Sequence, residues 1–383
     1  MTNESIIDFI RRVFNSEDNF VPLHAPVFNG NEKQYVLDTI DSTFVSSVGN
    51  YVNAFEKKLA EFTGAKYAVA VVNGTTALHL SLLLAGVKAG DEVLTQPLTF
   101  VATSNAIVHA GGVPVFIDVD IDSMGLSPVA LKKFLEEATF KNGDGECISR
   151  KTGNRIKACV PMHTFGFPGR IDEIVQVCSA YNIAVVEDAA ESLGSYYKGK
   201  HTGTYGLVGT FSFNGNKIMT CGAGGAIVTD DDAIAKKAKH LSTTAKIPHE
   251  WDFIHDEVAY NYRMPNLNAA VACAQIEQLD SFIRNKHQLS QLYAAFFEDS
   301  DVKFVQEIDQ ASANFWLNTI IFPDCQRQQS FLKESNAQKV MTRPVWELMN
   351  KLDMYKKCQT GNLVNAEWLA ERVVNIPSSV RLN

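Results

Sequence analysis

The sequence predicts an α/β protein with a large, mostly parallel sheet and a smaller C-terminal α+β domain. Between residues 67 and 242, short β-branched and aliphatic runs alternate with stretches that have helical spacing. Strands and helices repeated in this order build parallel sheets that are buried on both faces. The composition is typical of a folded globular chain, because 46% of the 383 residues are hydrophobic and 20% are charged.

The expected elements of the alternating region follow one another in a regular order. Its strands are expected at residues 67–72, 92–95, 114–119, 158–163, 183–187, 209–213 and 226–229. Its helices are expected at residues 75–85, 100–109, 127–138, 171–181 and 230–241. The last of these helices begins with acidic residues and carries lysines later, which agrees with the helix dipole.

The pattern changes after about residue 248. One long helix is expected from residue 266 to 285, and helical spacing continues to Phe297. Short strands (316–321, 340–343) and helices (325–335, 365–372) follow, as in a small α+β domain. We therefore expect a large domain of residues 1–250 and a small domain of residues 251–383. The first forty residues are expected to pack against the body or against a neighbouring subunit.

Charge and cysteine content exclude several classes of protein. The net charge of −8 and the lack of a basic stretch argue against a nucleic-acid-binding protein. The seven cysteines are scattered without a CxxC pair, so we expect reduced thiols. A disulfide framework or a metal site is not expected. The N-terminus resembles no signal peptide and no apolar run reaches membrane-spanning length, so a cytoplasmic chain without membrane contact is expected.

Two side chains near strand ends carry the strongest chemical signal. Asp188 closes an apolar strand, and Lys217 follows an aromatic-rich strand and precedes the glycine-rich stretch 222–225. A lysine amine can hold the aldehyde of pyridoxal phosphate (PLP) as a Schiff base, and a carboxylate can keep the pyridine nitrogen protonated. The ordinary alternatives are an exposed lysine and a helix-capping aspartate. Glu187 is expected to face the other side of the strand.

Other residues add weaker signals along the chain. Gly74 and Thr75 lie at a strand-to-helix junction, where free N–H groups bind phosphate, although a simple capped turn is the alternative. Ser212 is a candidate phosphate donor or an ordinary strand serine. Phe100 is a candidate for stacking on the cofactor ring or a core residue. His163 ends a strand, either as an active-site or as a structural histidine.

Taken in chain order, these residues resemble the DegT/DnrJ/EryC1/StrS family of PLP-dependent sugar aminotransferases, which have fold type I (aspartate aminotransferase-like) architecture. The matching motifs are Asn73-Gly74-Thr75-Thr76-Ala77-Leu78, Pro97-Leu98-Thr99-Phe100, His163 with Gly166, Glu187-Asp188-Ala189-Ala190-Glu191, Phe211-Ser212-Phe213 with Lys217, and Asn261-Tyr262-Arg263-Met264. Three stretches resemble the branch that aminates 4-keto sugars in legionaminic acid and bacillosamine pathways. They are residues 213–217, 343–349 and 375–379.

The resemblance implies a role for each matching residue. Lys217 looks like the Schiff-base lysine, Asp188 like the partner of the pyridine nitrogen, and Phe100 like the ring-stacking aromatic. The phosphate ligands look like Gly74, Thr75 and Ser212. Asn261 matches a residue that reaches the phosphate from the other subunit, so the resemblance implies a homodimer with shared active sites.

Two positions depart from the family pattern. Glu191 stands near the phenolic oxygen of the cofactor, where many members have glutamine. A carboxylate there repels a phenolate unless one of them is protonated, so the alternative is that Glu191 points toward substrate. Ala223 stands where many members have glutamate. Relatives with histidine in place of the lysine are dehydratases, so Lys217 favours transamination.

The resemblance implies an enzyme that moves an amino group from an amino acid, glutamate by resemblance, to a nucleotide-linked keto sugar. A 4-keto-6-deoxy sugar and a role in surface polysaccharide or glycan biosynthesis are expected. The alternatives are a PLP-dependent sugar dehydratase or deoxygenase and a non-catalytic PLP-binding regulatory protein. Four residues are candidate substrate contacts, with surface salt bridges or core packing as their alternatives: His163, Arg263, Arg343 and Trp346.

Overall fold

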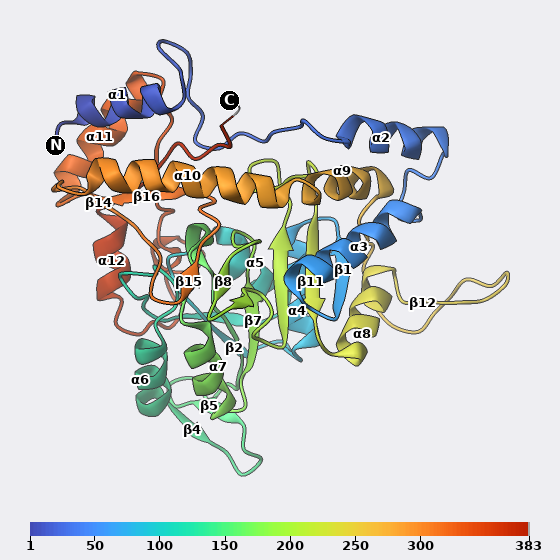
Figure 1. Cartoon of the computed structure of the whole chain (residues 1–383). Coiled ribbons are helices and arrows are strands. Elements are labelled where there is room, and N and C mark those ends of the chain that lie inside the picture. The colour runs from blue at the N-terminus through green and yellow to red at the C-terminus, as the bar shows by residue number, and fades with distance from the viewer. Residues whose placement is uncertain (382–383) are drawn as a thin grey trace.

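The computed structural model describes residues 1–381 and is built around one seven-stranded sheet (Figure 1). Across the sheet the strands are β1 (Tyr67–Val71), β11 (Gly225–Thr229), β10 (Val208–Ser212), β7 (Ala184–Asp188), β6 (Ile156–Val160), β2 (Glu92–Thr95) and β3 (Val113–Phe116). β11 alone runs in the opposite direction to the other six strands of this sheet. The predicted mostly parallel α/β architecture is confirmed.

Helices cover both faces of this sheet, as expected for strands that are apolar on both sides. One face packs against α4 (Gly74–Leu84), α5 (Val101–His109) and α8 (Asp232–Ser242). The other face packs against α6 (Pro128–Ala138), α7 (Ile171–Ser179), α3 (Asn50–Thr63) and α9 (Asn266–Ile276). Neighbouring residues of one strand enter different clusters, as Val185 and Val186 do, because side chains alternate across a strand.

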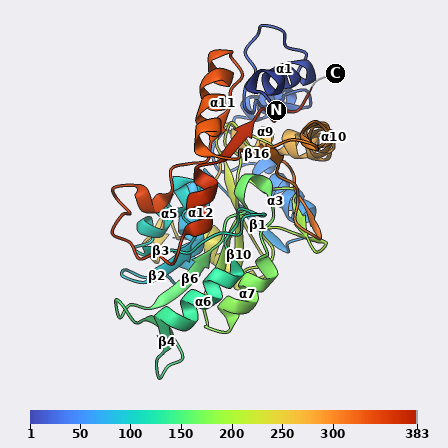
Figure 2. The same cartoon turned by 90° about the vertical axis from the view of Figure 1, so that its left-hand side faces the viewer.

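A second, four-stranded sheet lies in the C-terminal part of the chain (Figure 2). Its order is β14 (Lys303–Phe304), β16 (Asn318–Ile321), β18 (Val373–Ile376) and β17 (Arg343–Pro344), accompanied by α11 (Cys325–Ala337) and α12 (Val364–Ala370). We propose that residues 1–250 and 251–383 form two domains, since the seven-stranded sheet and the four-stranded sheet each lie wholly on one side of that boundary. The first helix, α1 (Asn3–Val13), nevertheless shares an apolar cluster with α11 and β18.

The predicted single helix from residue 266 onward is wrong in detail. It is divided into α9 and α10 (Leu279–Phe297), with Glu277 and Gln278 forming a turn between the two helices. The side-chain amides of Gln275 and Gln278 both donate to Glu32 Oε1, at 2.6 and 2.9 Å, and tie this break to α2 (Glu32–Asp41). The strand expected at 340–343 is reduced to the two residues of β17.

Shorter elements complete the chain. They are β4 (Thr139–Lys141), β5 (Cys147–Ser149), β8 (Tyr196–Tyr197), β9 (Lys200–His201), β12 (Lys246–Ile247), β13 (Ile254–His255), β15 (Ala311–Ser312) and two 3₁₀ turns, Thr164–Gly166 and Met349–Lys351. None of the helices formed by residues 1–381 combines the length and apolar character that crossing a membrane requires. All seven cysteines are free thiols.

Candidate active site

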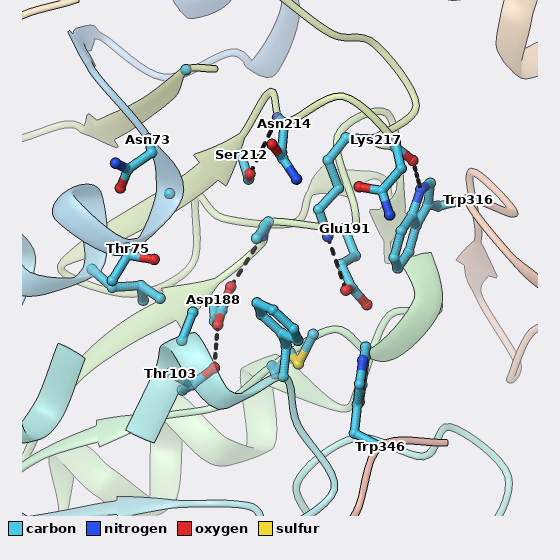
Figure 3. Close-up of a pocket in the computed structure, with 18 residues that line it drawn as sticks. Asn73, Thr75, Thr103, Asp188, Glu191, Ser212, Asn214, Lys217, Trp316 and Trp346 are labelled. Carbon is cyan, nitrogen blue, oxygen red and sulfur yellow. Dashed lines mark hydrogen bonds and ion pairs between the residues drawn. The ribbon is translucent and has the colours of Figure 1, made fainter. Parts of the chain in front are cut away.

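A cavity of about 330 Å³ lies at the carboxyl ends of the central strands (Figure 3). Asp188 at the end of β7 and Ser212 at the end of β10 both line it, together with the start of α4 and Lys217. The carboxyl ends of parallel strands meet at one edge of a sheet, and ligands bind there in open α/β folds. The fold therefore brings together residues that are up to 273 positions apart, from Asn73 to Trp346.

The start of α4 offers unpaired N–H groups to the cavity. Asn73 caps the helix, and its Oδ1 accepts the N–H of Thr76 at 2.9 Å. The N–H groups of Gly74 and Thr75 have no acceptor within the helix, because first-turn amides never do. A Cβ on Gly74 would lie 2.9 Å from Ser212 Cβ, so glycine is what allows α4 to begin against β10. Such a helix start, with the Ser212 hydroxyl beside it, suits an anion.

Asp188 faces the cavity and is almost fully buried. Its Oδ2 accepts the Thr103 hydroxyl at 2.7 Å and its Oδ1 accepts the Ala190 N–H at 3.2 Å. Burial raises the pKa of the Asp188 carboxyl, and these two hydrogen bonds oppose that rise only in part. A cationic group placed against this carboxylate would therefore be strongly stabilised, and in turn would keep Asp188 ionised.

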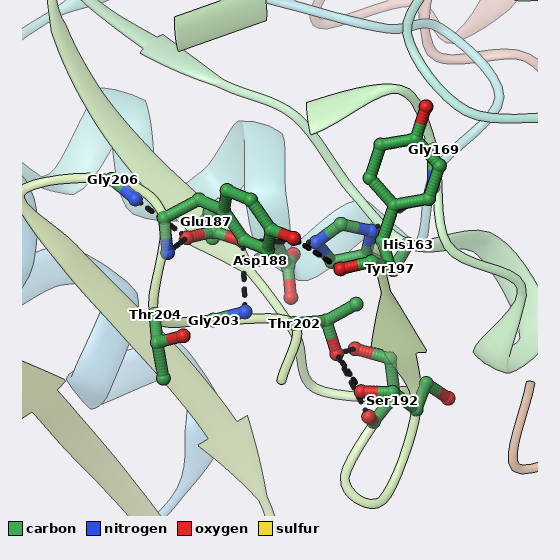
Figure 4. Close-up of polar contacts among 12 residues, drawn as sticks. His163, Gly169, Glu187, Asp188, Ser192, Tyr197, Thr202, Gly203, Thr204 and Gly206 are labelled. Carbon is green, nitrogen blue, oxygen red and sulfur yellow. Dashed lines mark hydrogen bonds and ion pairs between the residues drawn. The ribbon is translucent and has the colours of Figure 1, made fainter. Parts of the chain in front are cut away.

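The neighbouring Glu187 points away from the cavity, as the alternation of the strand predicts (Figure 4). Its carboxylate accepts the N–H groups of Gly203, Tyr205 and Gly206, at 2.8, 2.5 and 2.7 Å. It also pairs with Nε2 of His163 at 3.1 Å. This buried carboxylate joins β7 to the loop before β10 and so fixes the strand end that carries Asp188.

His163, a candidate substrate contact, does not line the cavity. Its ring is 1% exposed, Nδ1 accepts the Gly169 N–H at 3.2 Å, and Nε2 is left to donate to Glu187. The main-chain N–H of His163 donates to the Asp188 carbonyl at 3.1 Å. His163 is therefore the structural histidine of the two alternatives, and it acts on the site only by holding the end of β7.

Glu187→Gln is expected to lower the free energy of unfolding by about 3 kcal/mol, because an amide turns an N–H₂ group toward backbone donors and loses the charge that pairs with His163. Urea denaturation followed by circular dichroism measures this change. Asp172→Asn is the matched control, since Asp172 belongs to an exposed pair with Lys198, and its loss should cost less than about 1 kcal/mol. Equal midpoints for the two variants would contradict the anchoring role of Glu187.

Lys217 reaches the cavity from the loop after β10. Its Nζ donates to Glu191 Oε1 at 3.0 Å and lies 3.9 Å from the centre of the Trp316 ring. The indole Nε1 of Trp316 donates to the Asn216 carbonyl at 2.6 Å, which holds the ring beneath the lysine. Glu191 accepts the Phe165 N–H at 2.9 Å through its other oxygen. Burial raises the pKa of Glu191 to about 7, against the opposing effect of Lys217.

Two aromatic side chains form the opposite wall of the cavity. Phe100 is 48% exposed, so it presents its ring to the cavity instead of packing in the core. Trp346 lies 6.1 Å from Phe100 and 4.8 Å from Phe165, measured between ring centres. Trp346 lines the cavity, and its contact with substrate stays a prediction.

Three further candidates do not line this cavity. Arg263 is buried against α3, where its guanidinium pairs with Glu56 and donates to the Ala70 carbonyl at 3.1 Å. Arg343 is exposed and donates to Asn336 Oδ1 at 3.1 Å. Asn261 is exposed on the segment that bridges to Thr243, away from the cavity of its own chain.

Trp316 and Thr103 both line the cavity and were not revealed by the sequence. Trp316 is the more distant of the two from the predicted site residues. It lies 99 positions after Lys217 and stood only as the first residue of an expected strand. Asn314 fixes its main chain, since Asn314 Oδ1 accepts the Trp316 N–H at 2.8 Å and Asn314 Nδ2 donates to the Glu191 carbonyl at 2.8 Å. The sequence pattern that could have indicated Trp316 is an aromatic residue two positions after an asparagine. This pattern is too common to predict a functional site.

Comparison with known proteins agrees with the fold and with an aminotransferase activity. The chain is 37% identical over 363 residues to EpsN of Bacillus subtilis, named as a PLP-dependent aminotransferase, covering 93% of this chain and 90% of that protein. It is 35% identical over 359 residues to GDP-perosamine synthase of Escherichia coli O157:H7, covering 94% and 93%. A GDP-perosamine synthase of Vibrio cholerae is 33% identical, covering 94% of each chain.

Solved structures share the fold at lower identity. The aminotransferase TlmJ of Streptoalloteichus hindustanus matches with a TM-score of 0.85 at 24% identity, covering 94% of both chains. Helicobacter pylori PseC matches with a TM-score of 0.85 at 22% identity, covering 95% of both chains. These likenesses confirm the predicted fold type I architecture. The family profile described as the DegT/DnrJ/EryC1/StrS aminotransferase family matches residues 27–383. The chain belongs to the DegT/DnrJ/EryC1/StrS aminotransferase family.

Proposed function

We propose that this aminotransferase uses PLP to move an amino group from glutamate to the keto group of a nucleotide-linked sugar. The observation that carries the proposal is the convergence of Lys217 Nζ, the Asp188 carboxylate and the start of α4 on one cavity. An amine, a buried acid and an anion site are what the aldehyde, the ring nitrogen and the phosphate of PLP require.

The residues of the cavity fit this cofactor. The N–H groups of Gly74 and Thr75 and the Ser212 hydroxyl would hold the phosphate, and the exposed face of Phe100 would stack on the ring. Asp188 would stand against the ring nitrogen, where a cation offsets the cost of its burial. PLP when bound supplies a reactive aldehyde and a ring that accepts electrons.

The chain's own residues supply the remaining steps. Lys217 Nζ would act as the nucleophile toward the aldehyde and then move a proton at the substrate carbon. Thr103 and the Ala190 N–H keep the Asp188 carboxylate oriented through both of its oxygens. Trp316, Trp346 and Phe100 give the cavity apolar walls, which reduce the access of water to the reacting atoms.

The names of the relatives bear on the acceptor. Two of the relatives above are GDP-perosamine synthases, so their names point to a nucleotide-linked amino sugar as product. None of the three is named for the legionaminic acid or bacillosamine branch that the sequence resembles. We therefore propose a nucleotide-linked keto sugar as acceptor, and a 4-keto-6-deoxy sugar within surface polysaccharide or glycan biosynthesis as the narrower form of that proposal.

A homodimer with shared active sites is part of the proposal. Residues 246–258 project from the body as a hairpin (Figure 1). This hairpin carries exposed apolar side chains, with Trp251 71%, Phe253 80% and Val258 90% exposed. An exposed apolar segment of this kind favours contact with another chain. Asn261 follows this hairpin, which is consistent with a role at the partner's phosphate site.

The cytoplasmic location of the protein stays a prediction.

The proposal is tested with purified protein, PLP and glutamate, supplied in turn with 4-keto and 3-keto sugars linked to GDP, UDP or dTDP. We expect 2-oxoglutarate and the amino sugar to form in equal amounts from at least one acceptor. Loss of a sugar hydroxyl without 2-oxoglutarate would instead identify a dehydratase. Binding of PLP with no turnover of any acceptor would favour a regulatory protein.

A further inference from the structure

We propose that Glu191 is the proton acceptor of the Lys217 amine: its carboxylate takes the ammonium proton when Lys217 becomes a nucleophile and returns it afterwards. This inference rests on the proposed function, because it assigns a task within the same cavity. Glu191 contacts the reacting nitrogen itself, so the task is a direct one.

The contacts of Glu191 leave it little freedom. Oε1 accepts from Lys217 Nζ at 3.0 Å (Figure 3). Oε2 accepts from the Phe165 N–H at 2.9 Å. The main-chain carbonyl of Glu191 accepts from Asn314 Nδ2 at 2.8 Å. With both oxygens engaged in this way, the carboxylate is directed at the lysine. A proton can cross from Nζ to Oε1 along a hydrogen bond that is already formed.

The charged residues of the cavity identify Glu191 as the acceptor of the Lys217 proton. Of the residues that line it, Lys217 is the only lysine, arginine or histidine, and Asp188 and Glu191 are the only acids. Asp188 already accepts hydrogen bonds through both oxygens and has no hydrogen bond to Nζ. Glu191 is therefore the acid within reach of the nitrogen.

Burial drives the proton toward Glu191 once Lys217 reacts. A buried carboxylate is stabilised here by the adjacent ammonium, and burial already raises the pKa of Glu191 to about 7 with that ammonium present. A neutral amine, or an uncharged nitrogen bonded to an aldehyde carbon, no longer supplies that positive charge, so the carboxylate then favours its protonated form. The step converts NH₃⁺ and COO⁻ into NH₂ and COOH, and no other reactant is required.

This assignment explains the departure at position 191. A glutamine cannot accept the proton, whereas a glutamate at hydrogen-bond distance can. The sequence left open whether Glu191 lies near the phenolic oxygen of the cofactor or points toward substrate, and this assignment takes the place of both alternatives. Glu191 lies against Lys217, and its protonated form would avoid the repulsion expected between a carboxylate and a phenolate.

Infrared difference spectroscopy of the full chain tests the inference through the C=O stretch of a protonated carboxylic acid, identified as the band that Glu191→Gln removes. At about pH 8, one unit above the raised pKa, this band should be weak before PLP is added and strong after PLP is attached to Lys217. Attachment is checked separately by borohydride reduction and mass spectrometry of the peptide. In Lys217→Met without cofactor, the midpoint of the band should move up by more than about one pH unit.

Glu92→Gln is the matched control, because Glu92 is also a buried carboxyl with a raised pKa but lies at the start of β2, outside the cavity lining. The C=O band of the Glu92 carboxyl, identified as the band that Glu92→Gln removes, should change neither when PLP is attached nor in Lys217→Met. Attachment of PLP without a change in the Glu191 band, or an unmoved midpoint in Lys217→Met, would overturn the inference and leave the proposed function intact. Failure of PLP to attach in the wild type would instead count against the proposed function.

Discussion

Replacement of Lys217 by alanine is expected to lower the rate of amino transfer by at least about 10³-fold, since the residue supplies both a nucleophile and a proton-transfer group. The change is local, because the side chain lies at the cavity wall and its hydrogen bond goes to Glu191. Steady-state turnover with glutamate and the best acceptor measures the effect.

Lys217→Arg is the matched control for charge. A guanidinium keeps a positive charge near Glu191 and Trp316, but it does not form an imine with an aldehyde. Turnover of the arginine variant should therefore fall as far as that of the alanine variant. A turnover within about tenfold of the wild type in either variant would show that Lys217 is not the nucleophile.

Asp188→Asn is expected to lower kcat/KM by about 10²–10³-fold, because an amide cannot stabilise a cation in a buried site as a carboxylate does. The amide is nearly isosteric, so the fold should persist. The measurement is kcat/KM over a range of pH. The wild-type value should fall only at a pH low enough to protonate Asp188, because protonation removes the same charge and a cation against the carboxylate opposes the rise in pKa that burial causes.

Thr103→Val separates charge from orientation in this pair. It removes the hydroxyl that donates to Asp188 Oδ2 at 2.7 Å and leaves the carboxylate in place. A loss of about tenfold is expected, well below that of Asp188→Asn. An Asp188→Asn enzyme as active as the threonine variant would mean that the carboxylate does not face a cation.

The sequence was informative where chemistry coincides with strand ends. Asp188, Ser212 and Gly74 each stand at the end of an apolar strand or just after it, and parallel strands bring such positions to one edge. Their convergence was predictable without coordinates. The orientation of Glu187 followed in the same way from the alternation of side chains along β7.

Contacts between distant segments were not predictable in this way. The placement of Trp316 beneath Lys217 depends on Asn314 and on the path of the chain after α10. Arg263 looked available to substrate, yet a buried glutamate 207 positions earlier binds it. No glycine or proline marks the break between α9 and α10 in the sequence. The hydrogen bonds to Glu32 that accompany the break come from a distant part of the chain. The local sequence pattern does not indicate which distant residues will make such contacts.

Borohydride reduction of the protein incubated with PLP, followed by digestion and mass spectrometry, tests most directly whether Lys217 and Asp188 share one cofactor. The peptide that contains Lys217 should carry the mass of a reduced phosphopyridoxyl group, and Asp188→Asn should keep the label while turnover is lost. A label on any other lysine, or no label on an active enzyme, would contradict the assignment of this cavity as the active site.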